Sequence, residues 1–87
     1  MTETADARLR RLKVRCWRRG TKEMDLLLGP YADALLEGRA ETDLDAFEAL
    51  TAEADSDLYV WIAGKAPAPE THGPALAALR RFHGIGA

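Results

Sequence analysis

The sequence has 87 residues, and we expect one small domain with room for a single hydrophobic core. Hydrophobic residues make up 47% of the chain and charged residues 30%, a balance that excludes disordered and fibrous proteins. The net charge is −2, and one cysteine excludes both an internal disulfide and a zinc site built from cysteines alone.

Apolar residues recur at helical spacing through most of the chain, so helices are predicted. The first is expected over residues 5–19, with Leu9, Leu12 and Cys16 on one face. Gly20 should end it, because glycine tolerates the left-handed backbone that follows many helices.

A second helix is expected to follow directly. Thr21 is its predicted N-cap, and Glu23 lies in the first turn, where the helix dipole favours an anion. Pro30 stands inside the apolar pattern, so a kink is expected after Gly29. Gly38 should close this helix.

The rest of the chain is predicted to be helical too. The expected elements are a third helix opened by Thr42 or Asp43 and running to about Ala54, a fourth capped by Ser56 or Asp57 and ended by Gly64, a Pro-rich connector over 65–72, and a last helix beginning at Pro74. Residues 58–62 could also form a strand, but a lone strand would have no partner. We therefore predict an all-α fold, a compact bundle of about five short helices in a single domain over 1–87, with about 1–4 and 84–87 flexible.

Charge is distributed unevenly along the chain. Eight of the twelve basic residues lie between Arg8 and Lys22, whereas Glu23 to Asp57 holds eleven carboxylates and one base, Arg39. The basic stretch is either a solvated helix face paired with the acidic remainder or a docking surface for an anionic partner. A pI of about 5.6 argues against a general nucleic-acid binder.

Motifs of catalysis are absent from the sequence: there is no Gly-rich phosphate loop, no His-Glu-x-x-His and no Gly-x-Ser-x-Gly. His72 and His83 lack ligands at metal-binding spacing and are expected at the surface, so we predict no metal site and no catalytic residue. Cys16 is expected to be a small buried hydrophobic residue. Trp17 and Trp61 are expected to be core aromatics.

The turn between the first two helices carries the strongest functional signal. Gly20 leaves the backbone uncovered, so that another chain can approach closely. Arg19 offers a planar donor fork for carboxylate, phosphate or carbonyl groups, and Glu23 can cap its own helix or accept from a partner. The alternative is a tight corner with an internal Arg19–Glu23 pair.

Arg19-Gly20-x-x-Glu23 resembles the Arg-Gly-x-x-Glu motif of the SdhE family, the succinate dehydrogenase assembly factor 2 proteins. The resemblance covers roughly residues 8–64. The other matching features are a basic first helix before the motif, Met24-Asp25 after it, an apolar run over 26–31 interrupted by proline, and Asp57-Leu58-Tyr59-Val60-Trp61-Ile62 at the end of an acidic stretch.

The resemblance implies an assembly factor and not an enzyme. Such proteins bind the flavoprotein subunit of succinate dehydrogenase, and in some bacteria of fumarate reductase, and promote covalent attachment of FAD to a histidine of that client. FAD is then the client's cofactor, and this chain holds none permanently. The partner-binding residues that the resemblance implies are Arg18, Arg19, Gly20, Glu23 and Asp25.

The motif also suggests a mechanism. Arg19 and Glu23 would hold the client's domains where the flavin methyl group meets the histidine, so that attachment is helped by positioning. We expect a monomer without nucleic acid or membrane insertion. The polar, acidic N-terminus has no secretory or mitochondrial signal, so we expect a bacterial cytoplasmic protein.

A nucleic-acid-binding helical module is the alternative function. Its basic stripe would be an exposed line of Arg8, Arg11, Arg15 and Arg18 over phosphates, and its binding would depend steeply on salt. A regulatory partner protein, such as a member of a toxin–antitoxin pair, is a third possibility.

Overall fold

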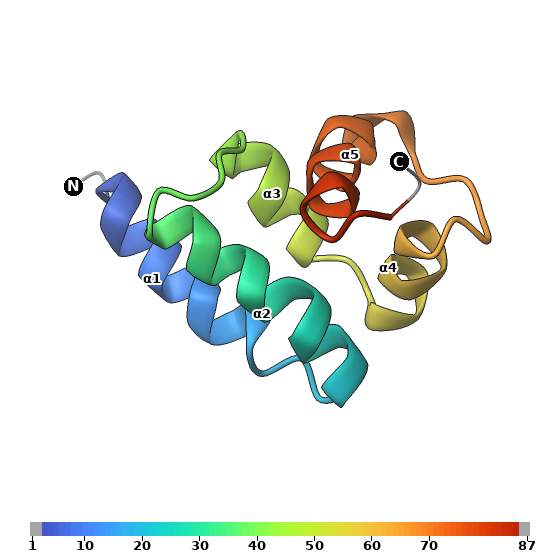
Figure 1. Ribbon diagram of the computed structural model, residues 1–87, viewed down its shortest axis with the longest axis horizontal. Coiled ribbons are helices and arrows are strands. Elements are labelled where there is room, and N and C mark those ends of the chain that lie inside the picture. The colour runs from blue at the N-terminus through green and yellow to red at the C-terminus, as the bar shows by residue number, and fades with distance from the viewer. Residues whose placement is uncertain (1–2, 86–87) are drawn as a thin grey trace. The chain divides into compact units, whose positions relative to one another are not determined.

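The computed structural model describes residues 3–85, and in this part of the chain it contains five α-helices, one short 3₁₀-helix and no strand (Figure 1). The all-α prediction of about five short helices is confirmed. The chain falls into two compact units, Met1–Glu41 and Thr42–Ala87, which are described separately. A single domain over 1–87 stays a prediction.

The first unit is a helical hairpin. Helices α1 (Ala5–Cys16) and α2 (Lys22–Leu36) run antiparallel and side by side (Figure 1). Its larger buried apolar side chains are Leu12 and Cys16 from α1 and Met24, Leu28, Tyr31 and Leu35 from α2, and Ala32 and Ala34 of α2 are buried as well. The burial of this stripe stabilises both helices, since isolated helices of this length are marginal in water.

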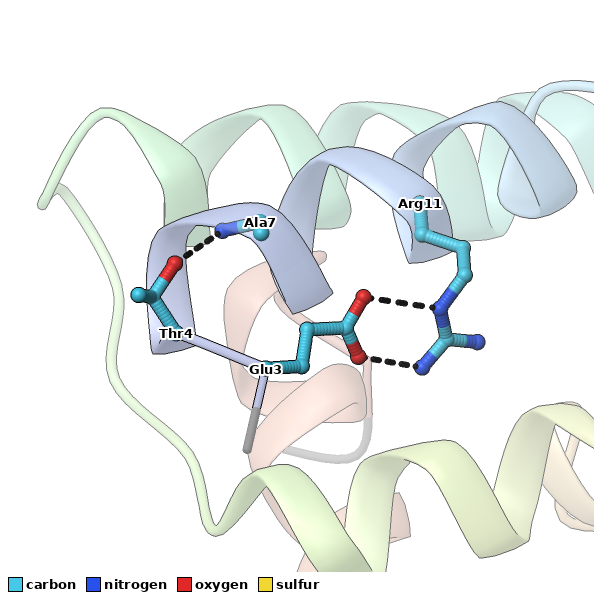
Figure 2. Close-up of polar contacts among 4 residues, drawn as sticks. All are labelled: Glu3, Thr4, Ala7 and Arg11. Atoms are coloured by element: carbon cyan, nitrogen blue, oxygen red, sulfur yellow. Dashed lines mark hydrogen bonds and ion pairs between the residues drawn. The ribbon is translucent and has the colours of Figure 1, made fainter. Parts of the chain in front are cut away.

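Two side-chain interactions lie at the N-terminus of helix α1. The Thr4 hydroxyl accepts a hydrogen bond from the Ala7 amide at 3.1 Å, as an N-cap does. The Glu3 carboxylate binds the Arg11 guanidinium through two bonds of 3.0 and 3.2 Å (Figure 2). Of the ends expected to be flexible, residues 1–2 and 86–87 lie outside the described residues.

The predicted end of the first helix was wrong by three residues, because α1 stops at Cys16 and not at residue 19. Gly20 does have a left-handed backbone, with φ +102°, but it lies inside the turn that follows. Beyond Cys16 the chain leaves the helical path, and the Arg19 amide finds its acceptor in the side chain of Asp25. Basic residues continue to Arg19, and residue composition does not show that the Arg19 amide donates to Asp25 instead of to a carbonyl of α1.

The boundaries of α2 follow local rules, as predicted. Thr21 caps it by accepting from the Met24 amide at 3.3 Å, and Glu23 lies in its first turn. The helix continues through Pro30, where the missing N–H removes one hydrogen bond. Its last residue is Leu36, and Gly38 (φ +76°) closes it two residues later, as predicted. The kink after Gly29 stays a prediction.

The second unit contains α3 (Leu44–Thr51), α4 (Asp55–Ile62), the 3₁₀-helix η1 (Glu70–His72) and α5 (Gly73–Phe82). Helix α5 contacts α3, α4 and η1. The fully or almost fully buried apolar side chains are Phe47, Leu50, Leu58, Ile62, Ala75, Leu76 and Leu79. Residues 58–62 are helical, which confirms the choice of helix over strand.

Two boundaries in the second unit differ from the predictions. Asp43 caps α3 as expected, but the helix ends at Thr51 and not near Ala54. Helix α4 begins earlier than expected, with Ala54 as an N-cap that makes no side-chain hydrogen bond. Neither Ser56 nor Asp57 is the cap, because both are already inside the helix, with Asp57 in its first turn, where a carboxylate favours the dipole.

The prediction of a surface position for His72 was wrong. Its Nε2 lies 3.0 Å from Glu53 Oε2, its ring is 5.7 Å from that of Trp61, and the residue is only 9% exposed. The reason is η1, which turns the Pro-rich connector back onto α3 and α5. Trp61 itself is half-buried, and His83 is half-buried edge-on against Phe82.

Candidate functional site

All five predicted partner-binding residues lie in one part of the first unit. They occupy the turn after α1 and the first turn of α2, and residues 17–25 are called the corner below. Arg18, Gly20 and Glu23 are exposed, whereas Arg19 and Asp25 are half-buried. The corner therefore offers a basic group, a bare stretch of backbone and an acidic group to the surroundings.

A glycine is needed at position 20 because of the backbone conformation there, and not because neighbouring atoms leave no room for a side chain. Its φ of +102° is a conformation that residues with a side chain rarely adopt, and a Cβ built there would meet nothing within 4 Å. Strained conformations of this kind cost of order 1–3 kcal/mol for other residues. The space above Gly20 is open, which agrees with the interpretation that another chain can approach there.

The Asp25 side chain binds its own corner. Its Oδ1 accepts a hydrogen bond of 2.7 Å from the Arg19 backbone amide. A bond from an amide to a charged carboxylate is short and strong compared with a neutral one. Since Thr21 caps α2, the Glu23 carboxylate is not needed as its N-cap and stands exposed on the first turn.

The prediction that Trp17 is a core aromatic was wrong. The side chain begins the corner, is 36% exposed, and lays its ring against Gly29 of α2, where a Cβ would sit 2.4 Å from two ring carbons. Its indole N–H donates to Asp33 Oδ1 at 3.2 Å, and Lys13 Nζ lies 3.3 Å from the same oxygen. The signal for this contact is Gly29, because a glycine inside a helix costs about 1 kcal/mol and needs a packing reason.

Cys16 is buried, as predicted. Burial raises the pKa of its thiol to about 12, and the nearby positive charges of Arg19 and Arg15 oppose this shift only in part. The thiol is therefore protonated near neutral pH. Since the thiolate is the nucleophilic form, this side chain is suited to packing and not to covalent chemistry.

At least three of the eight residues of the basic stretch form ion pairs within the first unit. Arg10 binds Asp6 at 2.8 Å, Arg11 binds Glu3, and Lys13 binds Asp33. Of these three, Arg11 belongs to the stripe predicted for phosphates, and its pairing with Glu3 favours the interpretation of a solvated helix face at that position. Exposed pairs of this kind contribute little to stability.

The described residues, 3–85, contain neither a metal-binding cluster nor a membrane-spanning helix. There is no group of three or more histidine, cysteine, aspartate or glutamate side chains that could hold a metal ion in that range. Within the same residues, no helix has both the length and the apolar character needed to cross a bilayer.

Comparison with known proteins identifies the family. The family model described as flavinator of succinate dehydrogenase matches residues 10–83. The FAD assembly factor SdhE of Acetobacter pasteurianus is 38% identical over 76 residues, which are 87% of this chain and 68% of that protein. No solved structure matches the chain.

Two mitochondrial proteins named succinate dehydrogenase assembly factor 2 are similar as well. That of Schizosaccharomyces pombe is 38% identical over 68 residues, 78% of this chain and 49% of its own length. That of Mycosarcoma maydis is 34% identical over 68 residues, again 78% of this chain but 29% of its own length. The match thus spans less than half of either mitochondrial relative and about two thirds of the bacterial one. On the match over residues 10–83, the chain belongs to the family of succinate dehydrogenase flavinators.

Proposed function

We propose that this protein is an assembly factor that promotes covalent attachment of FAD to the flavoprotein subunit of succinate dehydrogenase. The observation that carries the proposal is the family match over residues 10–83. The bacterial relative named FAD assembly factor supports it, since that protein is covered over 68% of its length. Fumarate reductase is a second proposed client.

The proposed binding surface is the exposed part of the corner. Arg18 and Glu23 offer opposite charges on either side of Gly20, and the open space above Gly20 admits a partner's backbone. The side chain of Arg19 completes this surface with a planar donor fork. Such an arrangement can orient a partner through several polar contacts at once.

We propose that the chain acts by positioning and that the attachment reaction is the client's own chemistry. The buried, protonated thiol of Cys16 supports this, because it leaves the only cysteine without nucleophilic character. Holding two reacting groups in the correct geometry can by itself remove a large part of a barrier. We further propose that the chain works as a monomer in a bacterial cytoplasm and holds no FAD permanently.

The test is covalent flavin in the flavoprotein subunit, expressed with and without this chain and read as flavin fluorescence of the denatured band. Fluorescence should depend on the chain and fall with Gly20→Ala. Gly38→Ala is a matched control, because Gly38 also has a positive φ and open space around it, in the same unit but outside the corner. Equal fluorescence with and without the chain would refute the proposal.

A further inference from the structure

The end of α1 differs from the ends of α2, α4 and α5. After α2, α4 and α5, a glycine with positive φ is followed by an amide that donates back to its own helix. These three bonds run from Arg39 to Ala34, from Lys65 to Val60 and from Ile85 to Arg80, each at 2.8 Å. After α1, Arg18 stands at the glycine position, and the next amide, that of Arg19, donates to the Asp25 carboxylate.

The amide of Arg19, which follows α1, therefore donates to a side chain of α2. The bond from the Arg19 amide to Asp25 closes a short ring of backbone that contains Gly20. Glycine populates positive and negative φ with similar ease, so nothing in Gly20 itself selects φ +102°. The bond to the Asp25 carboxylate limits the conformations open to Gly20, since it closes the ring that contains this glycine.

Trp17 fixes the other side of the corner. Its ring lies on Gly29 and its indole N–H is bound to Asp33, so the chain is anchored just before Arg18. Trp17 is bound to Asp33 of α2, and the Arg19 amide is bound to Asp25 of α2. These two bonds restrict the backbone conformations of residues 18–21. A binding element ordered in advance loses less conformational entropy when its partner arrives.

We infer that Asp25 is a positioning residue, which holds Gly20 and the Arg19 backbone in the shape that the partner binds and does not itself contact the partner. The inference rests on the proposed function for the identity of the partner. It changes the role expected for Asp25, because Oδ1 of its carboxylate binds an amide of its own chain. Arg18, Gly20 and Glu23 remain the exposed contact groups.

The test compares two substitutions that separate charge from acceptor. Asp25→Asn removes the charge and keeps an acceptor oxygen, whereas Asp25→Ala removes both. In the isolated chain, hydrogen exchange of the Arg19 amide should be a few-fold faster than wild type for Asp25→Asn, whose neutral oxygen makes a weaker bond, and at least about tenfold faster for Asp25→Ala. The Kd for the isolated flavoprotein subunit should follow the same order, with a loss of about tenfold only for Asp25→Ala.

Glu23→Gln is the matched control for a contact residue. It should weaken binding to the flavoprotein subunit while leaving exchange at the Arg19 amide unchanged. Asp25 is shown to be a contact residue, and the inference is overturned, if Asp25→Asn weakens binding as much as Asp25→Ala does while the Arg19 amide stays protected. Unchanged exchange in Asp25→Ala overturns it equally.

Asp25→Glu serves if the alanine variant does not fold. It keeps the charge but moves the oxygen by one methylene, so faster exchange and weaker binding are expected. Wild-type binding together with an unprotected Arg19 amide would overturn the inference. If the wild-type chain does not bind the flavoprotein subunit, the proposed function and the partner's part in this inference both fail, whereas exchange at Arg19 still decides whether Asp25 holds the corner.

Discussion

Replacing Gly29 by alanine tests the packing that anchors the corner. The new Cβ would lie 2.4 Å from two carbons of the Trp17 ring and 2.8 Å from a third, so the ring has to leave its place. The displaced indole loses its hydrogen bond to the Asp33 carboxylate, a loss of about 0.5–1.5 kcal/mol because this bond is exposed to solvent. It also loses part of its apolar contact with α2.

The net effect follows from weighing these losses against one gain. Exposing roughly 50 Å² of ring surface costs about 1 kcal/mol at about 25 cal/mol per Å². Alanine in place of glycine inside a helix returns about 1 kcal/mol. We therefore expect Gly29→Ala to lower the free energy of unfolding by about 0.5–1.5 kcal/mol, measured by urea denaturation.

A double-mutant cycle decides whether the ring is the cause. In the background of Trp17→Ala the clash is absent, so Gly29→Ala should stabilise the chain by up to about 1 kcal/mol. A Gly29→Ala variant as stable as wild type, or the same destabilisation in both backgrounds, would refute the reasoning.

The remaining predictions concern other described features. Gly20→Ala should leave the helices formed by circular dichroism and cost about 1–3 kcal/mol of unfolding free energy, since only its positive φ is strained; a loss of helical signal would contradict this. The pKa of Cys16 lies near 12 against an ordinary 9.0, so the stability from its neutral thiol should be complete below about pH 9 and be lost as pH rises toward 12. Urea denaturation of wild type and Cys16→Ala across that range tests this, and parallel pH profiles would contradict it. His72→Ala should destabilise the chain by about 1–3 kcal/mol, because it removes a buried partner of Glu53, and unchanged urea denaturation would argue against that role.

Local rules account for the part of the fold that the sequence predicted well. The Thr21 cap and the glycine that ends α2 depend on residues within one turn of each boundary. The ends of α1 and α3 were placed too late, because helical composition continues beyond the last helical bond. Composition does not reveal that the Arg19 amide donates to the Asp25 carboxylate and not to a carbonyl of α1.

Tertiary contacts account for the errors at single residues. Trp17 and its hydrogen-bond partner Asp33 are 16 positions apart, and His72 and Glu53 are 19 apart. Neither pair can be found from helical spacing, since each depends on how separate helices or turns pack. The candidate site was predicted from the Arg-Gly-x-x-Glu motif and stays a prediction, whereas the bond of Asp25 to the Arg19 amide is seen only in the structure.

The dependence of the end of α1 on Asp25 has a consequence for the order of folding. The three helices that end with glycine can complete their last turns alone, because donor and acceptor belong to the same segment. The exit of α1 cannot, because its acceptor exists in place only after the first turn of α2 has formed. We therefore expect the corner to form together with the hairpin, and its amide at Arg19 should exchange with solvent through opening of the hairpin and not through fraying of α1.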